Sequence, residues 1–413
     1  MKKLQLLAAL AIGALCSAQA NATYQTRANL VKQDSITKYL TGLVAIGVRH
    51  GDATNITRNR QARDFIIQKY KDFGYIDNDA QPAIDEISTQ TFTGNSQSLQ
   101  NIIVTKKGTT YPDEYVIVCG HFDSVAAGRG ANDNGSGVAT ILELARILKN
   151  VPTQYSIKFI NFNAEEDGLL GSKAYVNNVV NATDPKMKIR LVFNLDQIGG
   201  RSDRTNNSVV CEEDRINDTG TNPKYGVNTT NNTASIAATA DLQTYVGYYS
   251  SLTGFIDNIY GSDYMPFEKN GETVIGLYER PTNSSGTVVT NPYYHNNTDT
   301  IAHLSYPYIF QVTKAALGAM QHFAVASTST LAVSDIEKTK DFELYPNPAK
   351  EILNINLDSS ITDFSFEVSD LNGRKIFSTK NQKQINTSQL KPGIYIGTLE
   401  TEKGTVNKKF IIQ

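Results

Sequence analysis

The stretch SIKFINFNAEEDGLLGS, residues 156–172, decides the fold of this chain. It begins with an apolar run of β-strand character, continues into the adjacent acids Glu165 and Glu166, and then enters a glycine-rich turn. A strand that passes through a short turn into a helix is typical of an α/β sheet. Two neighbouring carboxylates at the end of a strand repel each other, and a nearby divalent cation is the simplest way to offset that repulsion.

Strand-like runs alternate with helical patterns on both sides of this stretch. Strands are predicted at 101–105, 114–119, 156–163, 188–195 and 274–278. Helices are predicted at 35–40, 59–73, 137–149, 172–177, 233–250 and 308–326. Apolar strands between helices indicate an α/β domain over 24–328, with a mixed, largely parallel sheet flanked by helices. Residues 203–232 are polar and rich in Asn and Thr, and we expect them to form an exposed loop insertion.

The first twenty residues have the pattern of a secretory signal peptide. Lys2 and Lys3 form the basic end, residues 4–15 are apolar, and Ala18-Gln19-Ala20 fits a cleavage site, although cleavage at Ala22 also fits. No later segment has the length that a membrane-spanning helix needs. The formal net charge of −2 argues against a nucleic-acid partner, which needs basic patches.

Two cysteines follow the signal segment, Cys119 and Cys211. Export would permit a disulfide between them. However, Cys119 lies inside an apolar strand-like run, so we favour two free thiols with a structural role over a bridge.

The composition and the hydrophobic pattern of the chain change after Ser327. Residues 329–340 have the composition of a linker, and 341–413 contain short strand-like runs separated by turn signals. These runs are 352–357, 364–368, 375–378, 393–399 and 405–412. The pattern predicts a small all-β sandwich after the α/β domain.

Polar side chains cluster where the predicted strands of the α/β domain end. They are His121 and Asp123, Glu165 and Glu166, Asp196, and His295, with Asp133 just before the helix at 137–149. Ligands of open α/β sheets collect at the carboxyl ends of the strands. Nitrogen and oxygen ligands without cysteine suit catalytic Zn²⁺. Two histidines and three carboxylates suffice for two ions that share one carboxylate, which leaves another carboxylate as a general base.

Each cluster also has a common explanation when it is taken alone. A His-x-Asp pair is usually on the surface, an Asp-Asn-Gly stretch is usually a turn, and a Glu-Glu pair is usually a solvated helix end. The ordered co-occurrence of all of them, mostly after apolar strands, favours a metal centre.

Five stretches resemble the M28 zinc aminopeptidases of the bacterial leucyl aminopeptidase type. They are residues 120–124, 130–137, 164–172, 194–196 and 294–300, and the resemblance extends from about residue 40 to 326. It implies the zinc-exopeptidase fold and two zinc ions per chain. By this resemblance one zinc would be bound by His121 and Asp196, the other by Glu166 and His295, and Asp133 would bridge the two.

The resemblance also implies roles for residues around the ligands. Glu165 would be the general base, and Asp123 would orient the ring of His121. A cis peptide would follow Asp133. A tyrosine would stabilise the tetrahedral intermediate, and Tyr260 is the candidate for this catalytic role, with Tyr264 as its competitor.

The C-terminal segment resembles the sorting domain of the type IX secretion pathway. The resemblance rests on residues 345–349, 371–374, 390–395 and 408–412. It implies the secretion machinery as a partner and a secreted or cell-surface location. A generic sandwich that binds carbohydrate or protein is the alternative.

Together these patterns predict a secreted metallo-aminopeptidase that removes N-terminal residues from peptides or proteins. The alternatives are a glutaminyl-cyclase-like enzyme with one zinc, a carboxypeptidase-like enzyme of the same fold, and a non-catalytic binding protein. The pair Arg49-His50 could line the substrate entrance, but we expect it to be a surface pair.

Overall fold

A computed structural model describes residues 20–77, 86–214, 230–259, 261–328, 342–357, 361–370, 375–401 and 404–413. The chain divides into two compact units, Met1–Ala332 and Val333–Gln413. The predicted linker, and all of the predicted signal peptide except Ala20, lie outside the described residues. The domain boundaries proposed from the sequence therefore stay predictions.

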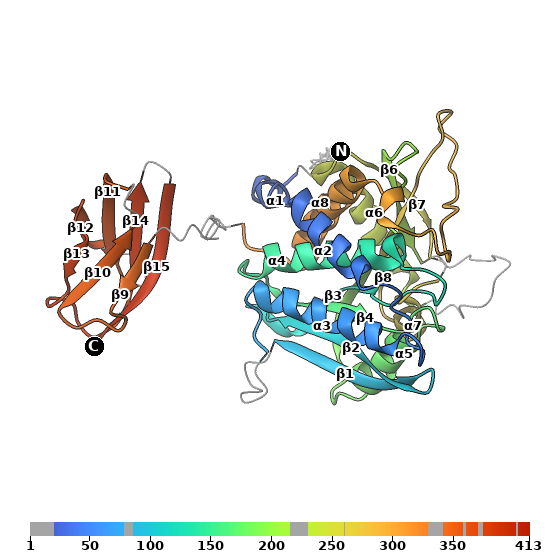
Figure 1. The fold of residues 1–413 in the computed structure, drawn as a ribbon, viewed down its shortest axis with the longest axis horizontal. Helices are drawn as coiled ribbons and strands as arrows, with labels where there is room; N and C mark the ends of the chain where they lie inside the picture. Colours follow the sequence, from blue (N-terminus) through green and yellow to red (C-terminus); the bar gives the residue numbers. More distant parts are fainter. Residues whose placement is uncertain are drawn as a thin grey trace, which may run out of the picture. The chain divides into compact units, whose positions relative to one another are not determined.

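The first unit is built on an eight-stranded sheet in the order β1-β2-β4-β3-β5-β8-β6-β7 (Figure 1). The strands are β1 (Ile87–Gly94), β2 (Gln97–Lys106), β3 (Tyr111–His121), β4 (Tyr155–Phe162), β5 (Lys188–Leu195), β6 (Ser208–Glu213), β7 (Thr253–Asn258) and β8 (Val274–Glu279). The four central strands β4, β3, β5 and β8 are parallel, whereas β1 and β2 run antiparallel at one side. The predicted mixed, largely parallel α/β sheet is confirmed.

Helices cover both faces of this sheet. They are α1 (Ala22–Ala28), α2 (Gln33–Ala45), α3 (Ile56–Asp72), α4 (Gly137–Leu148), α5 (Leu170–Tyr175), α6 (Asn232–Tyr249), α7 (Met265–Lys269) and α8 (Tyr306–Phe323). Figure 1 shows α2, α3 and α4 side by side over one face.

The alternation of side chains along β3 separates the two cores. Val116 and Val118 belong to the large apolar cluster that contains residues of α1 to α4, α6 and α8. Ile117 and Cys119 point to the other face and pack in the cluster that contains residues of α5 and α7. A strand with both faces covered carries a continuous apolar run, as this one does.

One expectation for the first unit is wrong. Residues 203–232 are not wholly an exposed loop, because Ser208–Glu213 form β6, which pairs with β7 and β8 inside the sheet. Five of its six residues are buried. The apolar run Val209–Cys211 is short and lies in a polar stretch, so its pairing partners, rather than its own pattern, make it a strand. Residues 215–229 lie outside the described part.

The two cysteines retained after the signal segment are both buried and free. This confirms the expectation of free thiols. Among the described residues, no helix combines the length and the apolar character needed to cross a membrane.

The second unit is an all-β sandwich, as predicted. Its strands are β9 (Phe342–Tyr345), β10 (Ile352–Leu357), β11 (Phe364–Ser369), β12 (Lys375–Lys380), β13 (Gln384–Asn386), β14 (Gly393–Thr401) and β15 (Gly404–Ile412). They form a three-stranded sheet, β13-β10-β9, and a four-stranded sheet, β12-β11-β14-β15. Phe342, Leu353, Phe366 and Phe410 are buried in the core of this unit.

Candidate metal centre

The parallel strands deliver their carboxyl ends to one edge of the sheet. His121 is the last residue of β3, Asp196 directly follows β5, and Glu165 follows β4 after two residues. Because β4, β3 and β5 are neighbours and parallel, these side chains emerge beside one another. Asp133 joins them from the kinked turn Ala131–Ser136 that leads into α4.

Two of the predicted ligands, Asp133 and Asp196, lie beside His121. Its Nε2 lies 3.2 Å from Oδ1 of Asp133 and 3.5 Å from Oδ1 of Asp196. The imidazole is fully buried, and the two carboxyl groups are nearly so. One nitrogen and two oxygens therefore converge on one point.

A second group forms around His295, in the connection between β8 and α8. Its Nε2 lies 3.4 Å from Oδ2 of Asp133 and 3.0 Å from Oε2 of Glu166. The ring stacks on Tyr294 with 3.7 Å between ring centroids. Its side chain is 44% exposed, so this side of the centre is reached by solvent.

The two groups share Asp133, one oxygen facing each histidine. The ligand atoms of each group lie within 4.8 Å of one another. Nε2 of His121, Oδ1 of Asp196 and Oε1 of Glu166 are buried without a hydrogen-bond partner. Buried polar atoms are almost always paired, so this set points to a ligand such as a cation. The nitrogen and oxygen donors fit zinc.

The charges in the centre are strongly coupled. Burial alone would raise the pKa of Asp133, but the imidazoles of His121 and His295 lower it to about 2. The same contacts with Asp133 and Glu166 raise the pKa of His295 to about 10. Burial and the charge of Asp133 raise the pKa of Glu166 to about 7. Asp133 is therefore favoured as a carboxylate, the form that binds a metal ion.

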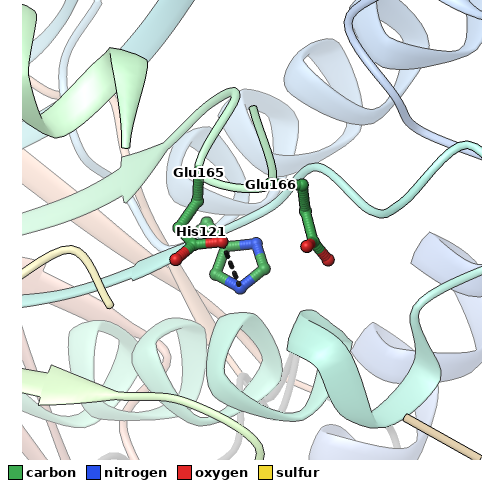
Figure 2. Close-up of side chains that lie close together, drawn as sticks. All are labelled: His121, Glu165 and Glu166. Carbon is green, nitrogen blue, oxygen red and sulfur yellow. Dashed lines mark ion pairs between the residues drawn. The ribbon is translucent and has the colours of Figure 1, made fainter. Parts of the chain in front are cut away.

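Glu165 faces the same space from the turn after β4. Figure 2 shows the carboxyl groups of Glu165 and Glu166 reaching toward the ring of His121. Oε2 of Glu165 lies 3.9 Å from Nε2 of His121. Burial raises the pKa of Glu165 well above its usual value, although the positive charge of His121 opposes the rise. The carboxyl group of Glu165 lies within 4.8 Å of the possible ligand atoms of His121 and Glu166, where it could exchange protons with a bound water.

Asp123 contacts both His121 and the main chain of the acidic turn. Its Oδ1 lies 3.5 Å from Nδ1 of His121. The main-chain N–H groups of Glu165 and Glu166 donate to its two oxygens at 3.2 and 3.3 Å. One buried carboxylate thus sets the orientation of both the histidine and the acidic turn.

The backbone beside the ligands is strained. Ala164, just before the acidic pair, has a φ of 55°, and Gln197, just after Asp196, has a φ of 46°. His295 itself has a φ of 55°. Left-handed backbone at residues other than glycine costs about 1–3 kcal/mol each and concentrates at functional sites. The peptide after Asp133 is cis, as the family resemblance implies.

A cleft of about 770 Å³ opens beside the centre. Glu165, Glu166 and His295 line one part of it. The rest combines apolar side chains with two lysines from α5 and α7, namely Leu169, Val176, Met265, Lys173 and Lys269. The cleft is therefore lined by acidic residues at the centre and by two lysines elsewhere.

Of the two candidate catalytic tyrosines, Tyr264 lies among the described residues. Tyr260 lies outside the described residues. Tyr264 is fully buried, and its hydroxyl donates to Oε1 of Glu212 at 2.8 Å. Burial raises the pKa of Glu212 to about 8. The hydroxyl of Tyr264 thus donates its hydrogen bond to a buried carboxyl group.

Sequence reasoning missed three residues that hold the ligands. Asp299 accepts the main-chain N–H of Asp133. Ser262 donates its hydroxyl to Oδ2 of Asp196 at 2.7 Å. The expected surface position of Arg49 is wrong, because this side chain is fully buried. Asp299 lies in the stretch 294–300, which carried the family resemblance, and Ser262 lies between the candidate tyrosines Tyr260 and Tyr264. Nothing in the local pattern marks Arg49.

Comparison with known proteins agrees with this geometry. Residues 101–320 match peptidase family M28, and residues 343–413 match the secretion system C-terminal sorting domain. Aminopeptidase YwaD of Bacillus subtilis is 36% identical over 160 residues. The match covers 38% of this chain and 29% of that relative, so the chain spans less than a third of its length.

Two solved structures share the fold. The LapA aminopeptidase of Legionella pneumophila has a TM-score of 0.58 at 18% identity, with 73% of this chain and 74% of that one covered. A glutaminyl cyclase of Bacteroides thetaiotaomicron has a TM-score of 0.52 at 17% identity, with 70% and 97% covered.

Histidines and carboxylates thus gather at the carboxyl edge of this α/β sheet, where they form a candidate metal centre. The family match extends over more than half of the chain, and the chain belongs to peptidase family M28. It also carries a secretion system C-terminal sorting domain.

Proposed function

We propose that this protein is a secreted aminopeptidase that uses two zinc ions and Glu165 as its general base. The observation that carries the proposal is the position of Asp133, whose two oxygens face His121 and His295 separately. A carboxylate with one oxygen toward each of two ligand groups is the arrangement that a pair of metal ions requires.

In this proposal His121 and Asp196 hold one ion, Glu166 and His295 hold the other, and Asp133 serves both. When bound, two zinc ions polarise the scissile carbonyl group and acidify the attacking water. Glu165 takes the proton from that water and delivers it to the amine that leaves. Asp123 keeps the acidic turn and His121 in place during this transfer.

The cleft supports peptides as substrates. Its acidic end suits the positively charged amino terminus of a peptide, and its apolar side chains suit an apolar first residue. Tyr260, predicted from the sequence as a donor to the tetrahedral intermediate, keeps that role as a prediction.

The sorting domain supports delivery to the cell surface or the medium. We propose that the secretion machinery recognises the β-sandwich at 343–413 and that residues 1–20 act as the signal peptide. Deleting residues 341–413 should abolish export while purified protein retains peptidase activity. Continued export of the truncated chain would refute the sorting role.

The test of the proposed chemistry combines zinc content with turnover. We expect about two zinc ions per chain in the loaded protein and hydrolysis of amino-acyl p-nitroanilides that chelation abolishes and zinc restores. A chain that binds zinc but does not cleave these substrates would contradict the proposal.

The second candidate is a glutaminyl cyclase, because the glutaminyl cyclase of Bacteroides thetaiotaomicron shares the fold. A cyclase should bind about one zinc ion per chain and convert N-terminal glutamine of a test peptide to pyroglutamate. His121, Asp133 and Asp196 form a group of possible ligands in addition to the group around His295. Two groups can hold two zinc ions, which favours the aminopeptidase over a cyclase with one.

A further inference from the structure

A buried arginine lies beneath the candidate metal centre. Arg49 belongs to the connection between α2 and α3, and none of its surface is exposed. Its Nε donates to the carbonyl oxygen of Phe122 at 2.7 Å, and its Nη2 donates to that of Gly130 at 2.9 Å. Its Nη1 donates to the carbonyl oxygen of Arg129. All three guanidinium nitrogens are therefore engaged.

These carbonyl groups belong to the two segments that carry metal ligands. Phe122 directly follows His121, and Gly130 precedes Asp133 by three residues. The guanidinium group is planar, and its donors point in fixed directions, so it sets the distance between the two segments. A lysine ammonium group, a single nitrogen, cannot reproduce this fork.

The main chain of Arg49 is also held. Its N–H donates to Oγ of Ser124 at 3.0 Å, and its carbonyl oxygen accepts from Nδ2 of Asn59 at 2.7 Å. Ser124 in turn donates to the carbonyl oxygen of Gly128. The arginine is thus anchored to α3 on one side and to the ligand-bearing loop on the other.

The charge of Arg49 faces the acidic cluster. Burial lowers its pKa to about 10, which still leaves it positively charged at neutral pH, and Asp123, Asp299, Asp133 and Glu166 attract it. The hydrogen bonds of its side chain go to main-chain oxygens. The carboxylate oxygens of Asp133 and Glu166 therefore stay available to a metal ion, while a fixed positive charge offsets part of their mutual repulsion.

We infer that Arg49 is a positioning residue for the metal centre, joining the segments of His121 and Asp133 through main-chain oxygens without occupying a ligand oxygen. This inference rests on the proposed function, in which those two residues bind zinc.

The hydrogen bonds of Arg49 and its positive charge predict opposite effects of substitution on zinc affinity, so the two contributions can be separated. If the hydrogen bonds of the guanidinium group dominate, Arg49→Lys and Arg49→Met both weaken zinc binding, because both release the Phe122 and Gly130 carbonyl groups. If the charge dominates, removing it relieves repulsion of the incoming cation, and only Arg49→Met changes affinity, by strengthening it. The three carbonyl contacts favour the first outcome.

The experiment measures zinc affinity of the metal-stripped full-length chain by competition with a chromogenic chelator. We expect Arg49→Lys and Arg49→Met to bind zinc about 10–100-fold more weakly than the wild type, the range seen when groups that orient ligands are removed. Circular dichroism and thermal melting establish that each variant is folded, and Arg49→Lys decides the question should Arg49→Met not fold.

Arg27 provides a matched control. It is also a buried arginine, in α1, and it donates to the carbonyl oxygen of Ser327 at 2.6 Å, away from the ligand segments. Arg27→Met should lower the melting temperature and leave zinc affinity unchanged.

The outcomes distinguish the inference from the function on which it rests. Zinc affinities of both Arg49 variants within twofold of the wild type, or tighter binding by Arg49→Met, would overturn the positioning role while leaving the proposed function intact. A folded wild-type chain that binds no zinc would overturn both.

Discussion

Asp299 holds Asp133 by its main chain. Oδ2 of Asp299 accepts the N–H of Asp133 at 3.0 Å, and Oδ1 accepts the N–H of Asn132 at 2.8 Å. The side chain of Asp133 is thereby left to face the two histidines. An acidic residue 166 positions away thus positions the shared carboxylate through its main chain.

Asp299→Ala should impair the metal centre more than it impairs the fold. It leaves two buried N–H groups without an acceptor, at a cost of about 1–3 kcal/mol each, and it frees the segment that carries Asp133. We expect zinc affinity to fall by about 10–100-fold, measured by chelator competition. Asp64→Ala, on an exposed part of α3, is the control. Unchanged zinc affinity in a folded Asp299→Ala protein would contradict this role.

The adjacent acids should separate proton transfer from metal binding. Glu165→Gln should keep the zinc content of the wild type and lose about 10²–10⁴-fold in kcat, because the amide cannot accept the proton of the water. Glu166→Gln should lose zinc, because Glu166 lies 3.0 Å from His295 within a ligand group. Metal analysis and p-nitroanilide hydrolysis on the two variants make the comparison. Near-normal turnover by Glu165→Gln would remove Glu165 from the proposed role.

Stability should fall in mild acid because of His322, a histidine outside the candidate metal centre. His322 on α8 stacks on Tyr245 with 4.0 Å between ring centroids, and it shares a hydrogen bond with the hydroxyl of Tyr249. Burial lowers the pKa of His322 from about 6.5 to about 4. Between these values the unfolded chain binds a proton that the folded chain does not, so stability present above pH 6.5 is lost as the pH falls toward 4.

His322→Gln tests this assignment, because glutamine does not titrate. Melting temperatures measured on metal-stripped protein from pH 7 to pH 4.5 should fall less steeply for His322→Gln than for the wild type. Parallel curves for the two proteins would show that His322 is not responsible.

The lysines of the cleft should influence which peptides are cleaved well. Lys269 and Lys173 line the cleft, and Lys269 is exposed, so reversing its charge should not disturb the core. We expect Lys269→Glu to lower kcat/KM for peptides with an acidic residue near the amino terminus, by up to about fivefold, as for an exposed ion pair of 0–1 kcal/mol. Lys188→Glu, at the exposed start of β5, is the control. An equal effect of both variants would indicate a general charge effect.

Local patterns in the chain were sufficient for most of the architecture. The strand at 188–195 and the helix at 137–149 were predicted almost to the residue, because the side chains of a strand or helix repeat with the period of that element. β1, β6 and β7 were not predicted. β1 pairs with β2, and β6 pairs with β7 and β8, and a pairing partner is not visible within a short window of sequence.

The sequence by itself determined which residue types were available for a metal centre, since His121, Asp133, Glu166, Asp196 and His295 each lie beside an identifiable strand end or turn. Only the tertiary structure decided that the two oxygens of Asp133 face different histidines. It alone also decided that Arg49 is buried, because an isolated arginine is normally exposed. Its burial depends on carbonyl groups that lie 73 to 81 residues away and that only the folded chain brings within hydrogen-bonding distance.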